Sequence, residues 1–135
     1  MKAIKLFASG FVEVTTLPEA EYTFERMQKA IGCDLVDIQS CALEQLKDYC
    51  LVFDEEFLLK GKPVINPLAS YFYGLQHHGQ PLCGDVLIMK DKFTDEGLET
   101  TGLDDDDIDF LLQVLTDSFL PAIKATTNFL KNFNK

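Results

Sequence analysis

The sequence has no tryptophan, only two histidines and no pair of cysteines in C-x-x-C spacing. It also lacks a P-loop and a G-x-G-x-x-G motif, so the standard loops that cradle nucleotide phosphates are missing. No apolar stretch reaches the roughly 18 residues that a membrane-spanning helix needs, so no such helix is expected. The chain must therefore be interpreted from its charge pattern and its periodicity rather than from a motif.

The four cysteines stand among apolar neighbours, which predicts buried thiols rather than a disulfide framework. They are Cys33, Cys41, Cys50 and Cys83. A zinc site built from Cys83 with His77 and His78 would follow no standard ligand spacing. Nothing in the local sequence places these adjacent histidines beside a nucleophile and an acid, so no catalytic triad is indicated. We expect no metal, no cofactor and no enzymatic activity.

The composition fits one soluble domain, because 135 residues with 47 % hydrophobic side chains can bury a real core. Eleven phenylalanines indicate a core of Phe, Leu, Ile and Val. The first residues alternate between polar and apolar and then reach an acid at Glu13, a pattern unlike a secretory signal. A cytoplasmic location is expected.

The net charge of −10 is unevenly placed along the chain. Residues 91–117 hold ten acids and one lysine, a net charge of −9, whereas residues 118–135 hold three lysines and no acid, a net charge of +3. Direct binding of nucleic acid is disfavoured, because phosphate contacts need Lys or Arg. A partner protein with a basic surface is favoured, because complementary fields speed the encounter.

Short periodic segments predict an α+β fold in a single domain with a small mixed or antiparallel sheet. Residues 2–17 alternate on both sides of Ser9-Gly10, which predicts an N-terminal β-hairpin, and the helix that follows should stop at Gly32. Strands are expected over residues 35–43, 48–55 and 84–91. The stretch "INPLASYFYG" predicts a short helix that Asn66 caps and Gly74 closes. The polar residues 92–102 predict a loop.

The last long segment has apolar residues at i, i+3, i+4, i+7 and i+11, which is one face of a helix. They are Ile108, Leu111, Leu112, Leu115 and Phe119. Pro121 should break this helix. Residues 1–117 would then form the domain, and residues 118–135 a C-terminal helical extension of the same domain.

The extension carries side chains that are too apolar to remain in water, so we expect it to be buried. These side chains are Ile123, Phe129, Leu130 and Phe133. They could pack on the domain's own sheet or on a second copy of the chain. Contact between the +3 tail and the −9 segment is electrostatically favourable in both cases, and a homodimer with a symmetric interface is expected.

Directly before the C-terminal helix, "GLDDDDIDF" contains an aspartate cluster made of Asp104, Asp105, Asp106, Asp107 and Asp109. One or two acids stabilise a helix start, but adjacent like charges repel, so helix capping does not explain five. A calcium loop starting at Asp91 would place Phe93 and Gly102 at ligand positions, so that template fails. A solvated face, a mimic of DNA phosphates and a patch that binds a basic protein remain open.

A site for a small ligand is the alternative to a protein-binding patch and belongs to a different class of function. The side chains of Asn66, Tyr71, Tyr73 and His77 lie close in sequence and could stack on a base or bond to it, as in a sponge for a nucleotide signal. Only Lys60, Lys62 and Lys90 are near enough in sequence to neutralise phosphates.

The order of "LVDIQSCAL", "DYCLVFDEEFLLKGKPVINPLAS", "GDVLIMKDKFTDEG" and "GLDDDDID" resembles an uncharacterised domain family of phages, plasmids and conjugative elements. The resemblance covers about residues 3–112 and rests on Asp54, Glu55, Leu59, Gly61, Pro63, Asn66 and Ala69. It implies an accessory protein of a mobile element, acting in the cytosol of a host cell. By analogy with small phage proteins, it implies a binder that inhibits or modulates a host protein, such as a nuclease used in defence.

Overall fold

The computed structural model describes residues 1–57 and 61–133, so Leu59 and Lys60 lie outside the described residues. The strands are β1 (Lys2–Leu6), β2 (Val12–Thr16), β3 (Val36–Ser40), β4 (Tyr49–Asp54), β5 (Val86–Thr94) and β6 (Gly97–Thr101). The helices are α1 (Thr23–Ile31), α2 (Pro67–Tyr73), α3 (Leu75–His78) and α4 (Asp105–Phe133), and residues Glu44–Leu46 form the 3-10 turn η1. This is a single α+β domain, as the sequence predicts.

The strands form one open antiparallel sheet in the order β2-β1-β5-β4-β3. The central strand β5 pairs with β4 on one side. Its other side is shared by two strands, because β1 pairs with Val86–Ile88 and β6 pairs with Lys90–Thr94. An isolated bridge between Lys2 and Leu103 joins the start of β1 to the segment that leads into α4. The sheet therefore places the start of α4 beside the first residues of the chain.

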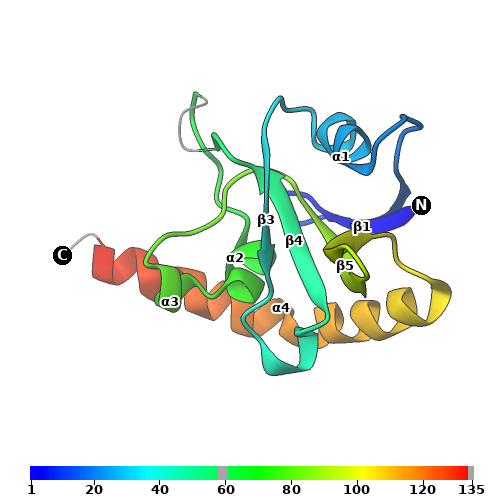
Figure 1. Ribbon diagram of the computed structural model, residues 1–135. Helices are drawn as coiled ribbons and strands as arrows, with labels where there is room; N and C mark the ends of the chain where they lie inside the picture. Colours follow the sequence, from blue (N-terminus) through cyan, green and yellow to red (C-terminus); the bar gives the residue numbers. More distant parts are fainter. Residues whose placement is uncertain (58–60, 134–135) are drawn as a thin grey trace.

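Helices cover both faces of the sheet (Figure 1). On one face α1 packs through Met27 over alternate residues of the central strands, such as Val52, Leu87 and Met89. On the other face α2 and α4 cover the larger core, whose fully buried members include Phe72 and Leu111. The alternation within β5 explains this division, because successive side chains point to opposite faces of a strand.

Helix α2 begins and ends at the residues that the sequence predicts. The side chain of Asn66 accepts a hydrogen bond from Ala69 N at 3.2 Å, Pro67 occupies the first turn, and Gly74 ends the helix with a φ of +94°. Only glycine adopts that backbone geometry without strain. Gly32 ends α1 in the same left-handed conformation, also as predicted.

Two local predictions are wrong. The predicted break at Pro121 is absent, because α4 continues through this residue to Phe133. Pro121 has no N–H group, so the carbonyl of Asp117 loses its helical hydrogen bond. Both residues are exposed, so water can bind that carbonyl. On the opposite side of the helix, the buried Ser118 and Ala122 pack against the core and keep the helix in place. The extension 118–133 is thus the second half of one helix.

The stretch 92–102 is not a loop, because it completes β5 and forms β6, with a turn that requires Gly97 at a φ of +116°. This hairpin is exposed and mostly polar, so it lacks the apolar alternation that usually identifies a strand. Among the described residues, no helix combines the length and apolarity that crossing a bilayer requires.

Candidate functional site

The aspartate cluster lies at the start of α4, and two of its members cap the helix. Asp107 N donates to Asp104 Oδ1 at 2.8 Å, and Asp104 N donates to Asp107 Oδ2 at 3.0 Å. This reciprocal arrangement is a capping box in which aspartate replaces the usual glutamate at the third helical position. It satisfies two backbone N–H groups that the first turn of a helix otherwise leaves without partners.

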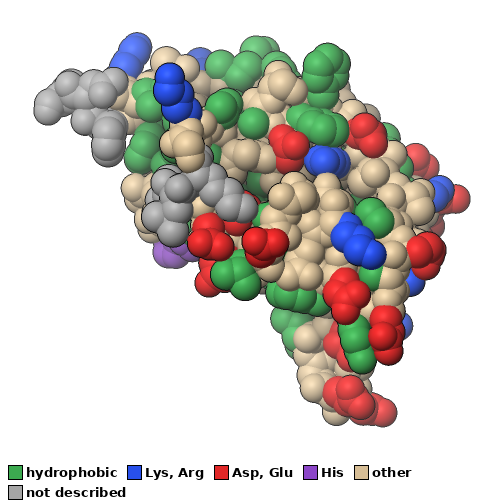
Figure 2. Space-filling view, turned by 90° about the horizontal axis from the view of Figure 1, so that it is seen from above, with side chains coloured by type: hydrophobic (Ala, Val, Ile, Leu, Met, Phe, Trp, Pro, Cys, Tyr) green, Lys and Arg blue, Asp and Glu red, His purple; other side chains and the backbone are tan. Residues whose placement is uncertain are grey.

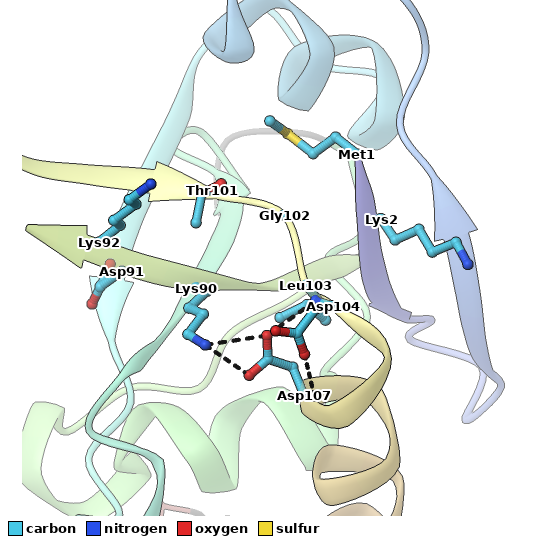
Figure 3. Close-up of a pocket in the computed structure, with 10 residues that line it drawn as sticks. All are labelled: Met1, Lys2, Lys90, Asp91, Lys92, Thr101, Gly102, Leu103, Asp104 and Asp107. Carbon is cyan, nitrogen blue, oxygen red and sulfur yellow. Dashed lines mark hydrogen bonds and ion pairs between the residues drawn. The ribbon is translucent and has the colours of Figure 1, made fainter.

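Asp107 also anchors the helix to the sheet. Its carboxylate accepts hydrogen bonds from Lys90 Nζ at 3.0 Å (Figure 3) and from the Tyr49 hydroxyl at 2.7 Å, and its side chain is only 8 % exposed. Tyr49 and Lys90 face each other on β4 and β5. The Tyr49 ring additionally stacks on Phe110, with centroids 6.1 Å apart. Asp107 is therefore part of the fold and does not belong to an exposed patch.

Titration behaviour follows from these contacts. Burial alone would raise the pKa of Asp107, but the hydrogen bonds from Asp104 N, Tyr49 and Lys90 outweigh it, so this pKa lies below its ordinary value. The same contacts raise the pKa of Lys90, mainly through its hydrogen bond to Asp107, and burial followed by the Asp107 contact raises that of Tyr49. At neutral pH the site holds a carboxylate, an ammonium and a neutral phenol.

A groove of about 550 Å³ lies above this network, between the β5–β6 hairpin and the start of α4 (Figure 3). Its lining includes Met1, Lys2, Lys92, Thr101 and Gly102. Lys2 Nζ lies 3.8 Å from Asp105 Oδ1, and both side chains are more than half exposed. The groove thus contains both lysines and carboxylates, and Asp107 already neutralises Lys90. The groove therefore offers no concentrated positive charge to a small anion.

The other members of the aspartate cluster, Asp104, Asp105, Asp106 and Asp109, are exposed. The neighbouring β5–β6 hairpin adds exposed acids at Asp95, Glu96 and Glu99. Figure 2 shows acidic side chains, interspersed with Lys and Arg, on its right-hand side, where Figure 1 places β5 and the first turns of α4, and further acids near the centre of the view. We call Asp95, Glu96, Glu99, Asp105, Asp106 and Asp109 the acidic surface.

The four residues of the alternative ligand site do not converge on one cavity. Asn66 is 1 % exposed, and its Nδ2 donates to Leu6 O and Gly84 O, both at 2.9 Å. Tyr73 is buried and stacks on His78, with ring centroids 3.8 Å apart. Tyr71 of α2 and His77 of α3 line a separate hollow that Ala125 of α4 also borders. Asn66 and Tyr73 are structural residues here.

The structure divides the apolar residues of α4 differently from the sequence pattern. Leu112 and Phe119, which were expected on the buried face, are 37 % and 44 % exposed. Ile123 and Leu130 are similarly exposed, whereas Phe129 is half-buried. The side chain of Phe133 lies outside the described part of the chain. Each residue turns a helix by about 100°, so positions at the border of the apolar face are the ones that a spacing count misassigns.

Buried thiols account for most of the cysteines. Burial raises the pKa of Cys41 to about 12 and raises those of Cys50 and Cys83, so the reactive thiolate is disfavoured at all three. Cys33 is half-buried. Within the described residues, no three His, Cys, Asp or Glu side chains converge closely enough to hold a metal ion.

We expect a thiol reagent at mildly alkaline pH to modify Cys33 first in the native protein, with Cys41, Cys50 and Cys83 reacting only on unfolding. Time-resolved labelling followed by peptide mass spectrometry measures this order, and a Cys33→Ser variant is the control that should remove the fast phase. Rapid native modification of Cys50 would contradict the buried environment described above.

The fold and the site define a small α+β domain with an acidic helix start and a partly buried ion pair that anchors this helix to the sheet. The chain belongs to the DUF3846 family, a domain of unknown function, whose match covers residues 1–116. This confirms the resemblance to an uncharacterised domain family, while residues 117–135 lie beyond the match. Neither the curated proteins nor the solved structures contain a significant match to the chain.

Proposed function

We propose that the protein is a non-catalytic binding protein that docks its acidic surface on a basic surface of another protein. The observation that carries this proposal is the exposure of Asp105, Asp106 and Asp109 in the first turns of α4, the helix that directly follows the β5–β6 hairpin with its exposed acids. Helix capping uses Asp104 and Asp107 and does not need the other three. Three further adjacent carboxylates repel one another, and a basic partner would relieve that repulsion.

The biological role that we propose is that of a phage or mobile-element accessory protein which inhibits or modulates a host factor in the cytosol, such as a defence nuclease. Nucleases and other DNA-binding proteins carry basic surfaces, because they must neutralise phosphates. An acidic surface fits such a partner. If it overlaps the partner's DNA-binding surface, the protein would act as a competitive DNA mimic, a special case of the same docking.

The test compares an acidic-surface variant with a charge-matched control. The variant carries Asp105→Asn, Asp106→Asn and Asp109→Asn. The control carries Glu13→Gln, Glu21→Gln and Glu44→Gln, three exposed acids outside residues 91–117. Both lose three charges, so a difference between them reports on position and not on net charge.

We expect the acidic-surface variant to bind a partner captured by the wild-type protein at least about tenfold more weakly, roughly 1.4 kcal/mol, and to lose salt dependence. Titration of the purified partner at low and high ionic strength measures both. Folding should be retained, because Asp104 and Asp107 still cap α4. Equal weakening by the control would show that net charge alone acts, and unchanged binding of the acidic-surface variant would exclude this surface.

A further inference from the structure

Helix α4 carries a row of exposed apolar side chains beside its buried face. Leu112, Phe119, Ile123 and Leu130 are each between 37 % and 44 % exposed. Their spacings of seven, four and seven residues place them along one line of the helix. We call these four residues the α4 stripe. Helix α4 runs along the lower part of the molecule in Figure 1.

A hollow lies next to the middle of the α4 stripe. Its volume is about 210 Å³, and it is enclosed by Phe119 and Ile123, by Pro67 at the start of α2, and by Phe7 and Gly10 at the β1–β2 turn. Phe11, in the same turn, is 75 % exposed. Exposed apolar side chains that line a hollow on a soluble domain are typical of an interaction site.

We propose that a second copy of this chain covers the α4 stripe, with the two α4 helices antiparallel about a two-fold axis at the level of Pro121. The stripe is symmetric about that level. Leu112 and Leu130 each lie nine residues from Pro121, and Phe119 and Ile123 each lie two residues from it. Antiparallel pairing therefore sets Leu112 opposite the partner's Leu130 and Phe119 opposite the partner's Ile123, which is the self-complementarity that a two-fold interface requires.

Charge selects the antiparallel direction. Helix α4 begins with Asp105, Asp106 and Asp109 and carries Lys131 in its last turn. In the antiparallel pair Lys131 lies near the partner's Asp109, and the two helix dipoles oppose each other. In a parallel pair acids would face acids. At 29 residues and about 1.5 Å per residue, α4 is about 44 Å long, enough for an interface of ordinary size.

The surroundings of the stripe fit a second copy better than a lipid surface. Helices that lie on membranes carry Lys and Arg on their polar face to meet anionic lipids. The exposed side of α4 instead begins with the aspartates described above. The proposal does not rest on the proposed function, because it needs no other partner. The two share Asp109, whereas Asp105 and Asp106 stay exposed at both ends of the dimer, and the Phe119→Asp variant tests the dimer without changing the acidic surface.

The test measures the mass of the purified chain by light scattering and sedimentation at micromolar concentration. We expect about twice the 15.2 kDa of one chain. Phe119→Asp should weaken dimerisation at least about 100-fold. The matched control is Phe93→Asp, a replacement of the same type at a side chain that is 85 % exposed on the β5–β6 hairpin, and it should remain dimeric. A monomeric wild-type chain would overturn the proposal, and so would a folded Phe119→Asp variant that still dimerises.

A charge swap keeps the proposal testable if Phe119→Asp fails to fold. Asp109→Lys and Lys131→Glu should each weaken the dimer at low salt, because each places like charges together, and the double variant should restore it. Circular dichroism checks that all three variants are folded. A double variant that is weaker than both single variants would refute the antiparallel arrangement, and a dimer that none of them affects would do the same.

Discussion

Replacing Asp107 by asparagine is expected to lower the free energy of unfolding by about 2–3 kcal/mol. The carboxylate is buried and accepts hydrogen bonds from Tyr49, Lys90 and the backbone of Asp104. Asparagine keeps one accepting oxygen but turns an N–H₂ group towards donors and leaves Lys90 without its counter-charge. The Lys90 side chain is 36 % exposed and can be partly solvated, so the loss should stay below the 3–5 kcal/mol typical of a fully buried broken pair.

Urea unfolding at neutral pH, followed by fluorescence and circular dichroism, measures this loss. Asp106→Asn is the matched control, because Asp106 is exposed in the same helical turn. It should change stability by less than about 1 kcal/mol. If the two variants unfold at the same urea concentration, the anchoring role of Asp107 is wrong.

The Asp107 contribution should also disappear in acid. The pKa of Asp107 is lowered in the folded state, so its stabilisation is complete above the ordinary aspartate pKa of about 3.9 and is lost as the pH falls through the lower folded-state pKa. The stability difference between wild type and Asp107→Asn should therefore be constant from about pH 7 to about pH 5 and shrink below about pH 4. A difference that grows on acidification would contradict the lowered pKa.

Replacing Asn66 by alanine is expected to cost about 2–4 kcal/mol. The variant loses the cap on Ala69 N and removes the Nδ2 donor from Leu6 O and Gly84 O, in a site where the side chain is 1 % exposed. These bonds tie the start of α2 to the end of β1 and to the turn before β5, so three elements lose a common anchor.

Thermal and urea unfolding measure the Asn66 effect. The control is Asn128→Ala, which removes the same side chain from an exposed position of α4 and should change stability by less than about 0.5 kcal/mol. An Asn66→Ala variant as stable as the control would show that the buried carbonyls find other partners. Greatly reduced soluble yield of Asn66→Ala alone would agree with the expected loss.

Elements with strong local signals could be predicted from the sequence. The cap at Asn66, the stop at Gly74, the alternation of β1 and β2 and the contiguous apolar run of β5 depend on neighbours within a few residues. The β5–β6 hairpin could not be predicted, because its exposed polar strands owe their pairing to the rest of the sheet. The unbroken helix at Pro121 likewise depends on packing against α2, which overrides the local preference of proline.

The candidate site was predictable only in part, for the same reason. A run of aspartates indicates a helix start, but the sequence alone does not show which of the five carboxylates is buried. Asp107 differs from its neighbours because of Tyr49 and Lys90, which lie 58 and 17 residues away in the sequence. The pairing of β4 with β5 thus determines which carboxylate is buried. The exposed aspartates can be identified only when that pairing is known.

The position of β5 between β1 and β4 affects how the chain folds during its synthesis on the ribosome. The first four strands are synthesised without the strand that joins them, since β1 meets its partner in β5 about 80 residues later. Until residues 86–94 leave the exit tunnel, only the hairpins β1–β2 and β3–β4 can form, and isolated hairpins are marginally stable. Folding to the native sheet should therefore begin late in translation, and its rate should be limited by this long-range closure. A nascent chain arrested before β5 would remain sensitive to protease, whereas one arrested after α4 would resist it.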